Sequence, residues 1–244
     1  MTTLNFTHLA EKSSPEFDTN AETGSTLPKS SEHFWTSIFA MFLLHLGRSE
    51  EKASPIWIFK TITQTAKEGP YYRAQKEGLS VNGLKFENMA VEVSATDLAK
   101  HFQNLGIPVE ISGIEPDITL LLPGDRYVFI ENKVTYNADL NPNQANSYAE
   151  LVIRLLDQGK QAQLFLLKSC GCGDPLYNSA KILQDKFNTN KFPDAFGVLL
   201  WEGIIRQMCT SHFALPGINI ASWKRFAEEL EKDADLQMVQ KTVR

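Results

Sequence analysis

The fold is decided by the stretch from Glu115 to Tyr148, which reads EPDITLLLPGDRYVFIENKVTYNADLNPNQANSY. It contains two apolar runs, residues 118 to 122 and 127 to 134, separated by Pro123-Gly124-Asp125. Because Pro, Gly and Asp favour turns, this pattern predicts two strands joined by a hairpin turn. The second run is apolar on both faces, which is typical of a central strand in a sheet covered by helices.

Outward from this stretch, short apolar runs alternate with helical patterns, and this alternation predicts an α/β architecture. Further strands are expected at residues 86–93, 109–112, 162–167 and 196–200, and a loop at 71–85. A helix is expected from a cap at Ser30 or Ser31 to a stop at Gly47. The other helices are predicted at residues 55–67, 95–105, 142–159, 176–187 and 201–208, with a last one beginning at Ser222.

The 244 residues, with 43% hydrophobic and 22% charged side chains, have the composition of an ordinary globular protein. The simplest domain organisation is a single domain over residues 31–244. Residues 1–30 are rich in Ser, Thr, Glu, Asn and Pro and lack apolar periodicity, so we expect a flexible arm there.

The net charge of -5 argues against a protein that coats nucleic acid through its overall charge, although a local basic groove is compatible with it. Nothing at the amino terminus resembles a secretory signal, and the most apolar segment, Ile38 to Leu46, is shorter than a membrane span. Three cysteines are too few for a disulfide framework, and Cys170-x-Cys172 matches no zinc module. These features predict a cytoplasmic location without a membrane segment.

The chemistry depends on which charged side chains share a face of the sheet. Residues two apart in a strand point the same way, so Glu131 and Lys133 project together and Asn132 points to the other face. A four-residue loop would place Asp117 opposite Asn132, on the wrong face. A three- or five-residue loop, or one bulge, would place it opposite Lys133 and on the same face as both charged residues. An active site requires the second arrangement.

On one face, the two carboxylates would repel each other, and their pKa values would be raised unless a cation joined them. Such oxygen ligands suit Mg²⁺ or Mn²⁺. A bound ion would polarise a phosphoryl oxygen and lower the pKa of a water molecule, while Lys133 orients that water or steadies the charge of the transition state. The residues therefore predict phosphodiester hydrolysis.

Pro116-Asp117, a hairpin and then Ile130-Glu131-Asn132-Lys133 resemble the PD-(D/E)XK nuclease superfamily. Gln144 and Tyr148, one helical turn apart, resemble the Q-x-x-x-Y pair that many members carry after the lysine. The segment between Lys133 and Gln144 is longer and richer in Asn and Pro than is usual in the superfamily. The resemblance spans about residues 30 to 210 and is specific over about 115 to 148. It implies a restriction-endonuclease-like core, a mixed sheet flanked by helices.

The resemblance also implies roles for individual residues. Asp117, Glu131 and the backbone carbonyl of Asn132 would bind the metal ion, Lys133 would be the catalytic lysine, and Gln144 would be a supporting polar contact. Glu32, at the start of the first helix, is either an accessory metal ligand or a solvated charge that favours the helix dipole. Asp117 by itself also suits a turn, and Tyr148 also suits core packing.

Two functions follow from the resemblance. The first is a Mg²⁺-dependent endonuclease that acts on DNA. The second is a nuclease-like fold that serves as a binding or assembly module in a defence or DNA-processing complex, which the acidic composition favours.

Overall fold

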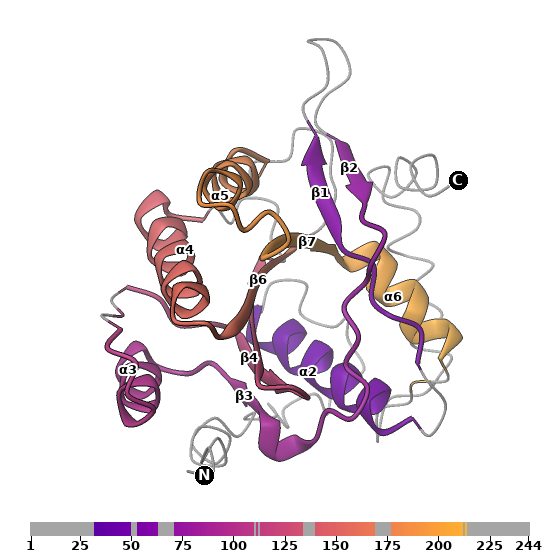
Figure 1. Cartoon of the computed structure of the whole chain (residues 1–244). Helices are drawn as coiled ribbons and strands as arrows, with labels where there is room; N and C mark the ends of the chain where they lie inside the picture. Colours follow the sequence, from indigo (N-terminus) through magenta and orange to yellow (C-terminus); the bar gives the residue numbers. More distant parts are fainter. Residues whose placement is uncertain are drawn as a thin grey trace.

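The strands within the described residues join into one mixed sheet in the order β2-β1-β7-β6-β5-β4-β3 (Figure 1). The computed structural model describes residues 32–49, 53–62, 71–109, 111, 113–133, 140–168, 177–211 and 213. Strands β5, β6 and β7 are parallel, and the other neighbouring pairs are antiparallel. The predicted α/β fold with a mixed central sheet is thus confirmed. The strands are β1 (Phe59–Ile62), β2 (Tyr71–Ala74), β3 (Met89–Val91), β4 (Ile118–Leu122), β5 (Arg126–Lys133), β6 (Gln161–Lys168) and β7 (Phe196–Leu200).

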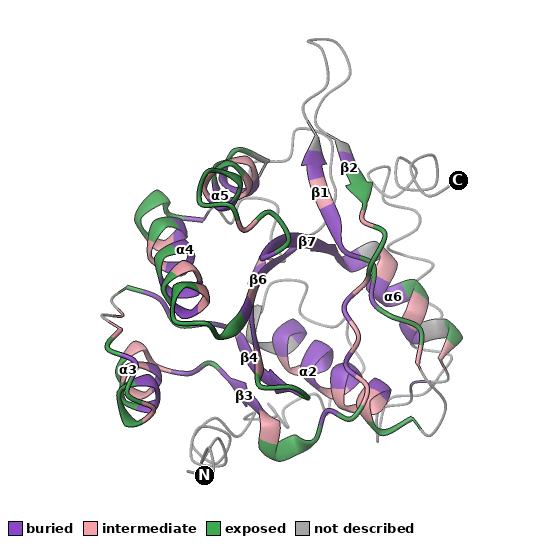
Figure 2. Cartoon of the chain, viewed as in Figure 1, coloured by how far each residue is buried: buried purple, intermediate pink, exposed green. Residues whose placement is uncertain are grey.

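Helices cover both faces of this sheet. Helices α2 (Glu32–Arg48) and α6 (Trp201–Thr210) pack on one face, and α3 (Ala95–Asn104), α4 (Pro142–Asp157) and α5 (Tyr177–Thr189) on the other. In Figure 2, the parts of the α4 ribbon coloured as buried face the sheet, and the parts coloured as exposed lie on the side away from it. No helix within the described residues is both long enough and apolar enough to span a membrane.

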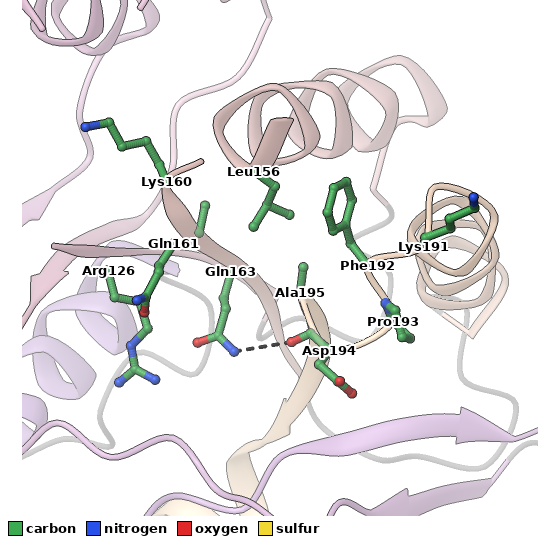
Figure 3. Close-up of a pocket in the computed structure, with 11 residues that line it drawn as sticks. Arg126, Leu156, Lys160, Gln161, Gln163, Lys191, Phe192, Pro193, Asp194 and Ala195 are labelled. Carbon is green, nitrogen blue, oxygen red and sulfur yellow. Dashed lines mark hydrogen bonds between the residues drawn. The ribbon is translucent and has the colours of Figure 1, made fainter. Parts of the chain in front are cut away.

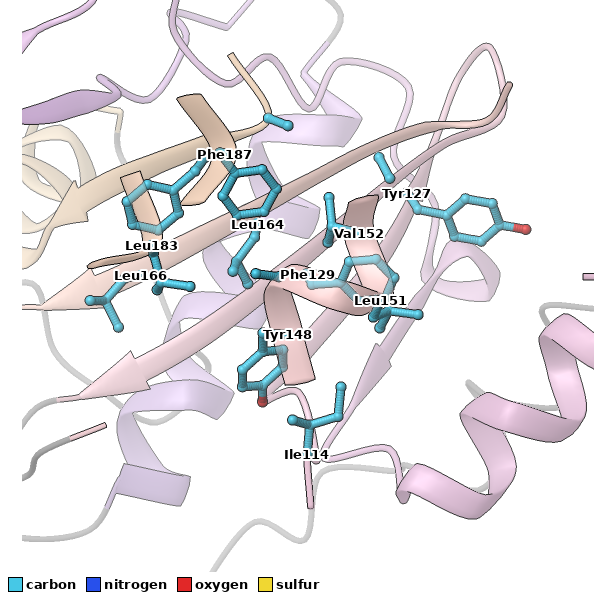
Figure 4. Close-up of a cluster of buried hydrophobic side chains, with 14 of the residues drawn as sticks. Ile114, Tyr127, Phe129, Tyr148, Leu151, Val152, Leu164, Leu166, Leu183 and Phe187 are labelled. Carbon is cyan, nitrogen blue, oxygen red and sulfur yellow. The ribbon is translucent and has the colours of Figure 1, made fainter. Parts of the chain in front are cut away.

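Strand β5 lies inside the sheet, as its two apolar faces predict, and pairs with β4 and β6. Tyr127 and Phe129 belong to the core cluster under α4, whereas Val128 and Ile130 belong to the cluster under α2. Figure 4 shows the α4 side, where Phe129 lies among apolar side chains of β6 and α4. Odd-numbered positions of β5 therefore face α4, which fixes the face of Glu131 and Lys133.

The first helix is confirmed, but it runs through Gly47, where a stop was predicted, to Arg48. A Cβ atom at residue 47 would lie 2.6 Å from the carbonyl oxygen of Leu84. Gly47 is therefore needed for the close approach of this helix to the segment around Leu84, rather than for ending the helix.

The predicted helix at 55–67 is wrong over its described part. Ile56 forms an isolated bridge with Leu79, and β1 follows from Phe59. Ile58 and Phe59 are buried in opposite core clusters, which is the burial pattern of a strand with two covered faces. The loop predicted at 71–85 is also wrong at its start, because β2 pairs there with β1. An apolar run this short suits either structure, and pairing with distant strands decides it.

Two other strand predictions need correction. Residues 86–88 form a 3-10 helix, and only β3 remains of the strand predicted at 86–93. Val109 and Ile111 are not in a strand but pack against the core.

The predicted strands at 118–122, 162–167 and 196–200 and the helices at 95–105, 142–159 and 201–208 are confirmed within a few residues. The predicted arm 1–30, the cysteines at 170 and 172 and the helix from Ser222 lie outside the described residues, and the single domain stays a prediction.

Candidate active site

The turn between β4 and β5 places Asp117 on the face of Glu131. Leu122 pairs with Arg126, so the loop holds only three residues, 123–125. Gly124 and Asp125 adopt φ angles of 84° and 57°, in the left-handed region that Gly and Asp tolerate best. Ile118 pairs with Ile130, and the same register continued by one residue sets Asp117 opposite Glu131. The prediction that Asp117 lies opposite Lys133 is therefore wrong. Asp117 does lie on the same face as Glu131 and Lys133, as an active site requires.

Asp117 is held by backbone groups of both neighbouring strands. Its Oδ2 atom accepts a hydrogen bond of 2.6 Å from the backbone N–H of Asn132. Its carbonyl oxygen accepts another, 3.0 Å long, from the N–H of Glu92 just beyond β3. Asp117 is thus fixed by the two strands on either side of β4, at the residue that precedes that strand.

Glu131 is the centre of the polar contacts on this face. Its side chain is 4% exposed, and its Oε1 atom lies 3.0 Å from Nζ of Lys133, whose side chain is 13% exposed. Gln144, in the first turns of α4, donates a hydrogen bond of 3.1 Å from Nε2 to the same oxygen. The carboxylate is thus oriented by a lysine of its own strand and by helix α4, and the predicted approach of Gln144 to the site is observed.

Tyr148 also donates to this carboxylate, through a hydrogen bond from its hydroxyl to Oε2 of Glu131. Burial raises the pKa of the Tyr148 hydroxyl well above its usual range, and the nearby charge of Glu131 raises it further. Tyr148 therefore stays a proton donor at neutral pH. It fills the core, as the sequence favours, and it also contacts the site, since position i+4 puts it on the same helix face as Gln144.

The opposite face of β5 carries a polar network that the sequence did not reveal. The fully buried Asn132 side chain donates from Nδ2 to Oγ1 of Thr36 in α2, at 3.0 Å. Its Oδ1 accepts from Nε1 of Trp201 in α6, also at 3.0 Å. This network ties the residue between Glu131 and Lys133 to two helices, and its members are 96 and 69 residues away in sequence.

The oxygen atoms brought together here are those that a hard divalent cation prefers. Two carboxylates, Asp117 and Glu131, share a face, and the Asn132 carbonyl lies on the same strand end. Among the described residues, no group of three or more His, Cys, Asp or Glu side chains is placed to hold a metal ion. Glu32 opens α2, but its side chain is not among those described, so its role as an accessory ligand stays a prediction.

A cleft of about 400 Å³ lies at the other end of the sheet (Figure 3). It is formed around the amino ends of β5 and β6, where Gln163 donates to the carbonyl oxygen of Asp194 at 3.2 Å. From Arg126 to Lys133, β5 extends about 23 Å at about 3.3 Å per residue. The cleft is therefore separate from the Asp117–Glu131 site. Its charged lining residues are Arg126, Lys160, Lys191 and Asp194.

Comparison with protein-family models, with curated proteins and with solved structures gave no match for this chain. Over its described residues, the fold defines the class of α/β proteins, with a mixed seven-stranded sheet.

Proposed function

We propose that this protein is a metal-dependent nuclease that hydrolyses phosphodiester bonds of DNA. The observation that carries the proposal is the register of the β4–β5 hairpin, which sets Asp117 opposite Glu131 with Lys133 on the same face. Two carboxylates and a lysine that lie together near the carboxyl end of β5 suit phosphoryl transfer. The resemblance to the PD-(D/E)XK superfamily supports the same chemistry.

The metal ion, Mg²⁺ or Mn²⁺, would be held by Asp117, Glu131 and the carbonyl of Asn132, and when bound would supply positive charge to a phosphoryl oxygen and to a water molecule. Lys133 is bonded to Glu131 and only slightly exposed, so its ammonium group is fixed beside the carboxylate. There it would stabilise negative charge that develops on the phosphoryl group. Gln144 and Tyr148 would keep the Glu131 carboxylate in one orientation.

The direct test is a plasmid nicking and degradation assay in Mg²⁺ or Mn²⁺. Lys133→Ala should lower the cleavage rate by about 100-fold or more, as expected for the loss of a charge that stabilises the transition state. Lys160→Ala is the matched control, because Lys160 is exposed and lies at the far end of the sheet. Unaltered cleavage by Lys133→Ala would defeat the assignment.

A second candidate is a nuclease-like fold that binds or assembles with other proteins and does not cleave. The observation that favours it is that both Glu131 oxygens already accept hydrogen bonds or an ion pair within the chain. A chain with this function would neither bind nor cleave duplex DNA, and it would co-purify with a protein partner.

A further inference from the structure

A second lysine lies on the face of the candidate site. Lys168 is the last residue of β6 and the register partner of Lys133 in the parallel β5–β6 pair. Residues paired in this way point to the same side of a sheet, with strands about 4.8 Å apart. Leu166 and Leu164, two and four residues before Lys168, belong to the core cluster under α4. Lys168 therefore faces the same side as Glu131 and Lys133.

The ammonium group of Lys168 is buried and oriented. Lys168 is only 1% exposed, and its Nζ atom donates a hydrogen bond of 3.0 Å to the hydroxyl oxygen of Tyr72. Nζ also lies 5.0 Å from the centre of the Tyr72 ring, in cation–π contact. Tyr72 belongs to β2 and is itself buried. A residue from the edge strand β2 thus holds a positive charge near the carboxyl ends of the central strands.

We propose that Lys168 is a positioning residue of the candidate site, whose charge, held by Tyr72, adds to that of Lys133 in attracting the phosphodiester backbone to the carboxyl ends of β5 and β6. This inference rests on the proposed nuclease function. A buried charge acts over a longer range than an exposed one, because the surrounding dielectric is low. The positive charge that attracts the nucleic acid also opposes the binding of a divalent cation by Asp117 and Glu131.

This opposition gives the inference a signature that a structural role lacks. Removing only the charge should weaken binding of an anion and strengthen binding of a cation, whereas damage to the packing weakens both. Lys168→Met removes the charge and keeps much of the side-chain volume. Lys168→Arg keeps the charge, and Tyr72→Phe keeps the ring but removes the hydroxyl that holds Nζ. Lys160→Met is the matched control, because Lys160 is exposed and directly precedes the opposite end of β6.

The experiment measures two affinities of the full chain. Mn²⁺ binding is followed by electron paramagnetic resonance without DNA, and binding of a fluorescein-labelled duplex is followed by anisotropy in EDTA. Lys168→Met should bind Mn²⁺ about tenfold tighter and the duplex about tenfold more weakly. Tyr72→Phe should shift both affinities in the same directions by about threefold, and Lys168→Arg and Lys160→Met should leave them near the wild-type values.

If Lys168→Met binds both Mn²⁺ and the duplex more weakly, or if neither affinity changes, the proposed role of Lys168 is overturned. If Lys168→Met does not fold, as judged by circular dichroism, Tyr72→Phe decides by the same criterion. A wild type that binds neither Mn²⁺ nor duplex overturns the proposed function and this inference together. A wild type that binds both and loses cleavage with Lys133→Ala, but does not respond to Lys168→Met, overturns the inference alone.

Discussion

Glu131 is the residue whose surroundings matter most, because its buried carboxylate depends on donors from three side chains. Tyr148→Phe removes the donor to Oε2 and leaves the packing in place. We expect a loss of about 1.5 to 3 kcal/mol in the free energy of unfolding, the range for a hydrogen bond to a charged group. Tyr127→Phe is the matched control, since that buried hydroxyl lies 3.4 Å from Nε2 of the neutral His101 ring, a partner without charge. Urea denaturation at pH 7.5 measures both, and an equal loss in the two variants would contradict this role for Tyr148.

Because His101 is buried, we expect the free energy of unfolding to fall in acid. Burial lowers the pKa of His101 to about 4 from its usual 6.5, so the folded state holds this ring neutral where the unfolded chain protonates it. Between these two values the unfolded state binds more protons, so the contribution of His101 is complete above pH 6.5 and is lost as the pH falls toward 4. His101→Gln should reduce the loss of stability between pH 7.5 and 5 by on the order of 1 kcal/mol. Urea midpoints at the two pH values test this, and identical losses in wild type and variant would refute it.

At the scale of elements, the junction of β1 and β7 depends on Gly197. A Cβ atom there would lie 2.3 Å from Cγ2 of Ile58 and 3.2 Å from the ring of Phe165. Ile58 Cγ2 is attached directly to the branched Cβ atom, whose rotation is restricted, so the clash can be relieved only if the backbone at the start of β1 moves. Gly197→Ala should therefore destabilise the protein by about 1 to 3 kcal/mol. Gly203→Ala, in α6 with open space around it, should instead stabilise it by up to about 1 kcal/mol. Thermal unfolding measures both, and the same sign in both variants would count against this close packing.

At the scale of the whole molecule, the two ends of the sheet differ. Asp117, Glu131 and Lys133 gather near the carboxyl end of β5, and the cleft lies at the amino end. A cation that binds only the folded protein raises its stability, by about 2.7 kcal/mol at 100 times the dissociation constant. Mn²⁺ should then raise the melting temperature by about 5 to 10 °C. Asp117→Asn should lose this increase, and Asp194→Asn, in the cleft, should keep it. Differential scanning fluorimetry checks the prediction, and an increase that survives Asp117→Asn would exclude Asp117 as a ligand.

Local signals in the sequence were sufficient for much of the fold and for part of the site. The turn chemistry of residues 123–125 and the apolar runs beside it predicted β4 and β5, and helical spacing predicted α4 with Gln144 and Tyr148 on one face. The short run around Ile58 was assigned wrongly, because its partners lie far away in sequence. The Asn132 contacts with Thr36 and Trp201 were not predictable for the same reason, since no local pattern marks a hydrogen bond between distant helices and a strand.

The sequence by itself determined that Glu131 and Lys133 project from the same side of one strand, because side chains in a strand alternate with a period of two. Only the tertiary structure decided that Asp117 joins them. Both faces of β4 and β5 are apolar, so burial alone does not select the pairing register, and the backbone conformation of the three-residue turn does. The docking of α4 then brought Gln144 and Tyr148 to Glu131, and the pairing of β5 with β6 brought Lys168 beside Lys133. These placements depend on packing between segments far apart in the chain.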